Sequence, residues 1–204
     1  MIQKSKSRGR PRAYDPEVAL DNAARLFWEH GFADATLDDL GTAMGMGRPS
    51  IYNAFGDKES LFLLALERFR DTIGSTPLRA FAEADSIREA LDALFRQTVE
   101  YTTADAAHLG CLLGNIAPAT ALPEVRTFLK ENLAMTEKRI AERLSAAVQT
   151  GELPPAYSAE QGAHDAVNAM LSLAARARLG SSREDLLRDA ASATQIVLGM
   201  PRTA

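Results

Sequence analysis

The sequence has little cysteine and no long hydrophobic stretch. Its 204 residues include a single cysteine, Cys111, which excludes an intrachain disulfide and a zinc site built from several cysteines. No apolar run approaches the roughly 18 residues of a membrane-spanning helix, and the basic start is not followed by the apolar segment of a signal peptide. These absences predict a cytoplasmic protein without a membrane partner.

Motifs of enzymes and metalloproteins are scarce too. His30, His108 and His164 lie far apart, and the acidic residues near them lack the spacing of a metal-binding helix. The sequence has no phosphate-binding glycine loop, no nucleophile elbow and no cysteine with a triad partner. We therefore expect no enzyme activity, no metal ion and no cofactor.

Charge is present but unevenly distributed. The net charge is −4, which argues against a uniformly basic nucleic-acid-binding protein. Residues 1–12 contain five basic and no acidic residues, whereas residues 13–204 hold 18 basic and 27 acidic residues, a net charge of −9. The pattern predicts a flexible basic arm over residues 1–13 attached to an acidic body.

Hydrophobic periodicity is helical almost everywhere, and the sequence contains several helix-start signals. Asp15 followed by Pro16 predicts the start of a first helix, which Gly31 should end. Four capping-box patterns predict later helix starts. They are Thr36 with Asp39, Ser86 with Glu89, Ser158 with Gln161, and Ser182 with Asp185. The predicted fold class is all-α, with about nine helices.

Residues 36–55 have the pattern of two short helices joined by a tight turn. The first helix should end at Gly45, and Pro49 belongs in the first turn of the second, because proline would break the middle of one long helix. This is a helix-turn-helix, a motif whose second helix presents its N-terminal side chains to the major groove.

The chain is predicted to divide into a small N-terminal unit and a larger helical bundle. A helix over residues 58–73 should end the three-helix DNA-binding domain, residues 14–73, because residues 74–77 read as a break. Residues 74–204 should hold helices over about 86–103, 123–149, 158–179 and 182–198, with an ambiguous segment over residues 111–117. Only two residues, Gly180 and Ser181, join the last two helices, which predicts an antiparallel hairpin.

Several motifs in residues 14–66 match a known family in both spacing and residue type. They resemble the DNA-binding domain of the TetR family of bacterial one-component transcriptional regulators. The motifs lie at residues 24–27, 31–32, 36–37, 40–52, 55 and 58–61. The rest of the chain resembles the family in helix count, length and closing hairpin. The resemblance implies a homodimeric repressor that binds a palindromic double-stranded DNA operator and is released by a small, mainly apolar effector.

The resemblance also implies which residues of the motif contact DNA. Family positions that match Thr36, Tyr52 and Lys58 contact phosphates, and here they supply a hydroxyl, a phenol and a cation. The candidate base readers at the start of the second helix are Arg48, Pro49, Ser50 and Asn53. Family members commonly have other residues at Gly47, Pro49, Asn53 and Ala54, so the resemblance does not carry over an operator sequence.

The basic arm is a second candidate DNA-binding feature. Arg8, Arg10 and Arg12 alternate with glycine and proline, and such a thin segment suits a narrow A·T-rich minor groove of enhanced negative potential. The alternative is a solubilising tail. Its attachment to a helix-turn-helix favours contact with DNA.

The predicted bundle supplies candidate residues for an effector cavity and for a dimer interface. In the family, helices of this region surround a mainly apolar cavity. The candidate pocket residues are Phe69, Phe95, Tyr101, His108, Cys111, Asn115, Phe128, Met135 and Met170.

The closing hairpin is rich in small residues, and in the family two such hairpins form a four-helix interface. The expected interface residues are Ala166, Met170, Leu173, Leu187, Ala190, Thr194 and Val197.

Cys111 leaves an alternative function open. An accessible thiolate near a cation or a helix N-terminus would make the protein a helical ligand or electrophile sensor that acts without sequence-specific DNA binding. The other interpretation of Cys111 is a small apolar core residue, which its residue type favours.

Overall fold

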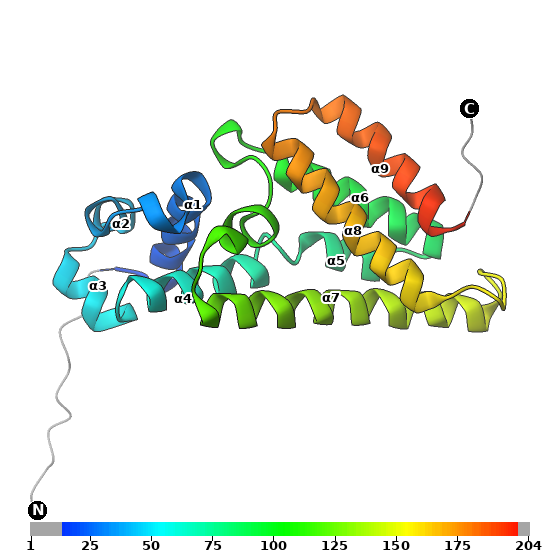
Figure 1. The fold of residues 1–204 in the computed structure, drawn as a ribbon, viewed down its shortest axis with the longest axis horizontal. Coiled ribbons are helices and arrows are strands. Elements are labelled where there is room, and N and C mark those ends of the chain that lie inside the picture. Colours follow the sequence, from blue (N-terminus) through cyan, green and yellow to red (C-terminus); the bar gives the residue numbers. More distant parts are fainter. Residues whose placement is uncertain (1–13, 200–204) are drawn as a thin grey trace, which may run out of the picture.

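A computed structural model describes residues 14–199, and this part of the chain is helical without β-strands (Figure 1). The all-α prediction and the count of about nine helices are confirmed for these residues. The α-helices are α1 (Pro16–Asp34), α2 (Leu37–Met44), α3 (Arg48–Phe55), α4 (Lys58–Asp71), α5 (Thr76–Glu83), α6 (Ile87–Thr102), α7 (Pro123–Thr150), α8 (Ala159–Arg178) and α9 (Arg183–Val197). Between α6 and α7 lie three short turns, η1 (Ala106–His108), η2 (Leu112–Ile116) and η3 (Ala117–Ala119).

The predicted helix starts and the helix-turn-helix are present. Thr36 and Asp39 form a complete capping box at α2, in which the Thr36 hydroxyl accepts from the Asp39 amide at 3.2 Å. Gly45 ends α2 in the left-handed conformation, with φ of 65°, which glycine adopts at little cost. The second complete capping box, Ser86 with Glu89, starts α6. The side chains of these capping boxes therefore accept hydrogen bonds from backbone N–H groups in the first turns of α2 and α6, which have no partner within the helix.

One boundary prediction is wrong, and one helix was not predicted. Gly31 has φ of 76° and ψ of 175°, which kinks α1 without ending it, and the helix resumes as far as Asp34. A break after α4 is present, but it spans residues 72–75 and leads directly into the unpredicted helix α5. Pro77 lies in the first turn of that helix, where its missing N–H costs no hydrogen bond, and Phe81 is buried one turn later. This helix is only eight residues long and begins without a side-chain cap, and in the sequence its proline and the preceding glycine are typical of a loop.

The hydrophobic core of α1–α4 extends beyond the N-terminal helices. Phe27 of α1 meets Phe62 of α4 edge-on, with ring centroids 4.7 Å apart. The η2 turn packs against both helices and adds Leu112 and Ile116 to the same core. A segment from the middle of the chain therefore helps to hold the helix-turn-helix frame.

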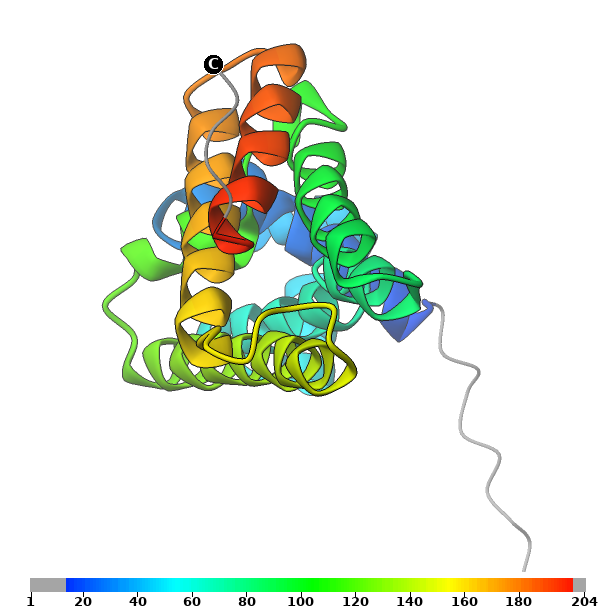
Figure 2. The same ribbon diagram turned by 90° about the vertical axis from the view of Figure 1, so that its right-hand side faces the viewer.

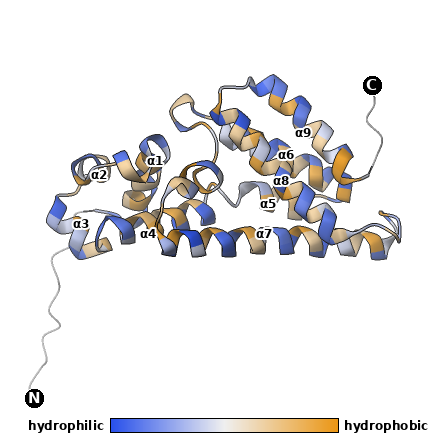
Figure 3. Ribbon diagram, viewed as in Figure 1, coloured by the Kyte–Doolittle hydropathy of each residue, from blue (hydrophilic) through white to orange (hydrophobic). Residues whose placement is uncertain are grey.

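The remaining helices surround a second core. In an end-on view α7 forms the base of a triangle, with α6 on one side and α8 on the other, and α9 closes the apex against both (Figure 2). Hydrophilic and hydrophobic residues alternate along α7 (Figure 3), as expected of a helix with one buried face. Within residues 14–199 no helix is both long and apolar enough to span a bilayer.

Candidate DNA-binding surface and effector cavity

The outer face of α3 is the exposed surface of the helix-turn-helix. Ile51 and Phe55, one turn apart, are buried and fix the inner face of this short helix. The remaining candidates therefore lie on the outside, and Tyr52 has half of its surface exposed. The four candidate base readers, all exposed, are Arg48, Pro49, Ser50 and Asn53.

Arg48 is paired with a neighbouring carboxylate rather than free. Its Nε donates to Asp38 Oδ1 at 2.6 Å and its Nη2 to Oδ2 at 2.5 Å, so α2 and α3 are joined by a bidentate ion pair. The hydrogen bond from Arg48 holds the pKa of the Asp38 carboxyl below its ordinary value. Both side chains are largely exposed, so the pair orients the guanidinium without burying it. Sequence reasoning missed Asp38, because ten residues separate the two and no local pattern links them.

Thr36 and Lys58 also have partners within the domain. The Thr36 hydroxyl donates to Asp39 Oδ2 at 2.5 Å, and its hydrogen bonds hold the pKa of Asp39 below its usual value. Lys58 Nζ donates to the Ala33 carbonyl at 3.3 Å, close to the end of α1, and lies 4.6 Å from the ring centroid of Phe32. Both residues sit at helix termini beside α3, and their phosphate contacts stay predictions. Arg8, Arg10 and Arg12 lie outside the described residues.

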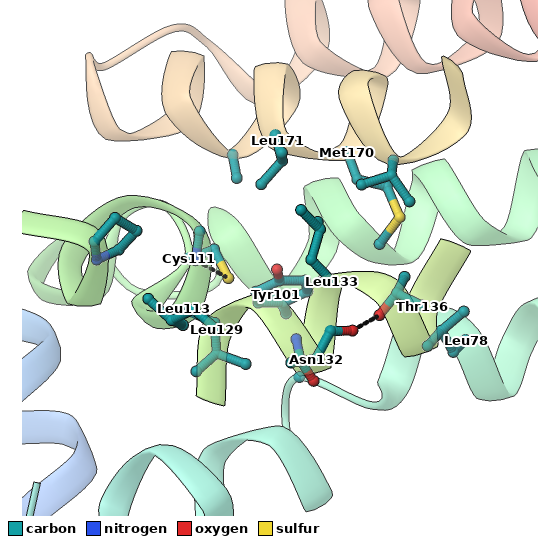
Figure 4. A pocket seen from close by; sticks show the side chains of 15 residues that line it. Leu78, Tyr101, Cys111, Leu113, Leu129, Asn132, Leu133, Thr136, Met170 and Leu171 are labelled. Atoms are coloured by element: carbon teal, nitrogen blue, oxygen red, sulfur yellow. Dashed lines mark hydrogen bonds between the residues drawn. The ribbon is translucent and has the colours of Figure 1, made fainter. Parts of the chain in front are cut away.

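A cavity of about 230 Å³ lies in the C-terminal bundle, between α7 and α8 and next to η2 (Figure 4). Met170 and Leu171 approach from α8, opposite Leu133 and Thr136 of α7. Most of the lining is apolar. The polar groups are few: Asn132 and Thr136, together with the Tyr101 phenol and the Cys111 thiol. Such a cavity suits a small, mainly apolar molecule held by a few polar contacts.

Three of the nine predicted pocket residues, Tyr101, Cys111 and Met170, line this cavity. The other six do not, because of where their helices direct them. Met135 is 55% exposed and points away from the cavity that its neighbour Thr136 lines, because consecutive helical residues are about 100° apart. Phe95 is buried in the second core.

The remaining four of these six have partners elsewhere. Phe69 packs edge-on against Trp28, with ring centroids 4.9 Å apart, and the Arg70 guanidinium carbon lies 5.3 Å from the centroid of the Phe128 ring. His108 Nδ1 is 2.9 Å from Asp105 Oδ2. The Asn115 side chain accepts from the Cys111 amide at 2.9 Å, so it shapes η2 rather than the cavity wall.

Cys111 lies between the cavity and the core of α1–α4. It is buried, and its sulfur accepts a hydrogen bond from the Gly114 amide at 3.3 Å. Burial raises the pKa of the Cys111 thiol above its ordinary value of 9.0. The thiol is therefore protonated near neutral pH, which disfavours the reactive thiolate of the sensor hypothesis.

Comparisons with known proteins agree with this arrangement. Residues 19–65 match the family described as bacterial regulatory proteins, tetR family, and residues 88–193 match the tetracyclin repressor-like C-terminal domain. The chain is 31% identical over 196 residues to the HTH-type transcriptional repressor ComR of Escherichia coli (strain K12), covering 94% of this chain and 92% of that protein. The chain belongs to the TetR family.

Solved structures of regulators bound to operator DNA have the same fold. A cysteine mutant of CifR in complex with a 26-base-pair operator aligns with a TM-score of 0.84 and 33% identity, covering 92% of this chain and 98% of that one. AibR, solved with isovaleryl coenzyme A and operator DNA, aligns with a TM-score of 0.68 at 19% identity, covering 88% of this chain and 96% of that one. The chain is thus a DNA-binding transcriptional regulator by family.

The predicted dimer-interface residues lie mostly in the core of the single chain, and their role in a dimer stays a prediction. Most are buried within the single chain, because α9 packs against α6 and α8 and uses the small side chains for close approach. The buried ones are Ala166, Leu173, Ala190, Thr194 and Val197, while Met170 and Leu187 pack partly buried against the same core. The exposed large apolar residues of α9 and of the α8–α9 connection are Ile196 and Leu179, whereas the partly exposed Leu171 of α8 lines the cavity.

Proposed function

We propose that the protein is a homodimeric repressor that binds a palindromic operator through α2 and α3 and is released by a small effector bound in the cavity. The observation that carries the DNA-binding part is the outer face of α3. Five of the six side chains from Arg48 to Asn53 are exposed there. The sixth, Ile51, is buried together with Phe55, and these two anchor the helix. A rigid short helix with exposed polar residues at its N-terminal end can enter a major groove.

The η2 turn supports a link between the cavity and the DNA-binding helices. Cys111, Leu113 and Gly114 line the cavity, whereas Leu112 and Ile116 of the same turn pack in the core of α1–α4. An effector that displaces one side of this turn must also move the other, because packed cores respond to small shifts. Effector binding would thereby change the position of the α1–α4 frame and weaken its fit to DNA.

Gel-shift binding tests the proposal. The full chain is mixed with labelled double-stranded DNA from upstream of its own gene, in the presence of excess random DNA. We expect the upstream probe to form a discrete shifted complex that excess random DNA does not remove. A scrambled probe of the same composition should be displaced from the protein by the same amount of random DNA. Equal binding of both probes would contradict the proposal and favour the alternative of a helical ligand sensor without sequence-specific DNA binding.

A further inference from the structure

A second hollow, of about 580 Å³, lies between α5 and α7 and is basic although the body of the protein is acidic. Its lining includes three arginines, Arg79 of α5 with Arg139 and Arg143 of α7, and one acidic residue, Glu142. We call this hollow the arginine cleft. Residues 13–204 carry a net charge of −9, so three arginines facing one carboxylate form a local reversal of charge.

The guanidinium groups of the arginine cleft keep donors available. Among the described residues, Arg79 has one long side-chain contact, of 3.4 Å to Thr76 Oγ1, and Arg139 has no ion-pair partner. Arg143 donates to the Ala84 carbonyl and lies 5.6 Å from the centroid of the Phe81 ring, which fixes its position.

Two further groups define the charge balance. The Arg143 Nε is buried without a hydrogen-bond partner among the described residues, a costly state that a bound anion would relieve. The Glu142 carboxylate lies 3.9 Å from Lys138 Nζ, so it already has a cation outside the cleft. The arginine cleft is therefore short of negative charge.

The arginine cleft adjoins the apolar cavity. Leu78 lines both hollows and lies beside Thr136 at one end of the cavity (Figure 4). On α7, Thr136 faces the cavity while Arg139, three residues further on, faces the cleft. A cavity of about 150 Å³ holds benzene, so 230 Å³ holds a somewhat larger apolar group. One molecule with an apolar part and an anionic head would fill both spaces.

We propose that the effector is an amphipathic anion, whose alkyl or aryl part fills the cavity and whose phosphate or carboxylate head binds Arg79, Arg139 and Arg143. The proposal rests on the effector-controlled function above and names the chemical class of that effector. Arginine forks bind both head groups through paired, charge-assisted hydrogen bonds. The cleft itself adjoins the end of α4, because Ser75 lines the cleft and its hydroxyl donates to the Thr72 carbonyl at 2.9 Å.

Calorimetric titration of the full chain tests this head-group preference. The probes are octyl phosphate, octanoate and the neutral 1-octanol, which share one chain length and differ in the head. We expect at least one of the two anions to bind about tenfold tighter than 1-octanol, as one to two charge-assisted hydrogen bonds provide. Preference for octyl phosphate or for octanoate then distinguishes a phosphate head from a carboxylate head.

Matched variants locate the preference. Arg139→Gln should remove most of the anion advantage while leaving 1-octanol binding unchanged. Lys130→Gln removes the same charge from an exposed position of α7 that does not line the cleft, and should bind the anions like the parent chain. Equal binding of all three probes, binding of none, or equal losses in both variants would each overturn the inference.

Operator binding without added probes separates this inference from the proposed function. A chain that shifts its operator but shows no preference for anions retains the proposed function and loses only the effector class. A chain that fails to shift any specific DNA loses the proposed function, whatever the probes do.

Discussion

The DNA-binding surface and the effector cavity differ in how far apart their residues lie in the sequence. The outer face of α3 is built from residues 48–53, on a helix whose start and end are set by neighbouring glycines. The cavity takes its lining from residues between 74 and 174, which five or more segments bring together. A surface made by one short helix is encoded locally, whereas a cavity depends on the phase and packing of every helix around it.

The largest expected effect is the loss of stability when a charge is placed in the core of the α8–α9 hairpin rather than on its outer face. Ala190→Glu places a carboxylate in the second core, where it has no partner, and should cost several kcal/mol, roughly 3–5. We expect loss of the cooperative thermal transition in circular dichroism. A wild-type transition in this variant would mean that α9 is packed differently.

Ile196→Glu is the matched control, because Ile196 is 47% exposed on the same helix. This variant should keep a cooperative thermal transition, since the new carboxylate does not enter the core of the chain. We predict that two subunits meet on this outer face of α9, so the variant should sediment as a monomer, with a thermal midpoint lowered only by the lost association. If the variant is still a dimer of unchanged stability, Ile196 does not lie in the dimer interface.

A second comparison sets the basic arm against the folded domain. Deleting residues 1–12 removes five of the 23 basic residues and should leave folding intact. Operator affinity should fall, and the slope of log affinity against log salt should flatten by about 0.9 for each phosphate that the arm no longer neutralises. Replacing Arg8, Arg10 and Arg12 with Gln keeps the arm length and should reproduce most of the change. An unchanged slope would identify the arm as a passive tail.

The two capping boxes offer a smaller, matched test. Thr36→Ala and Ser86→Ala each remove a cap hydroxyl and should each lower the free energy of unfolding by about 1 kcal/mol. Only Thr36 lies beside α3, so only its variant should also weaken operator binding. Urea unfolding together with fluorescence anisotropy on operator DNA measures both effects. Equal losses of DNA binding in the two variants would show that stability alone, not a phosphate contact, is responsible.

Much of the DNA-binding surface could be predicted from the sequence, since its determinants are local. Thr36, Gly45 and Pro49 each fix a backbone feature within a few residues of themselves. The pairing of Arg48 with Asp38 was not predictable in this way, because it depends on how α2 and α3 cross.

The cavity was less predictable. Met135 and Thr136 are adjacent in α7, and residue type favoured the methionine as a pocket residue. The helix instead turns Thr136 inward and leaves Met135 in water. The pattern of the hairpin is ambiguous for a related reason: small residues such as Ala190 permit close helix packing, and the same pattern serves a packed core within one chain or an interface between two.

The smallest expected effect concerns Cys111. Burial raises the pKa of its thiol in the folded chain, so the folded state keeps the proton to higher pH than the unfolded state. The free energy of unfolding should therefore fall as pH rises above about 9, and Cys111→Ala should reduce that fall. Iodoacetamide at pH 8 should react with the folded chain at least tenfold more slowly than with the urea-unfolded chain. Equal rates would revive the thiol-sensor alternative.

The central claim is that the N-terminal end of α3 reads bases. It is measured most directly by how Arg48→Ala changes the ratio of the affinity for the operator to the affinity for random DNA. Fluorescence anisotropy gives the affinities of parent and variant for the operator, for operators changed symmetrically at each position, and for random DNA. We predict that Arg48→Ala weakens operator binding by about 1–3 kcal/mol for each base contact, with discrimination abolished at one symmetric position and little change on random DNA. Equal losses on operator and random DNA would contradict the claim, because Arg48 would then be a phosphate contact.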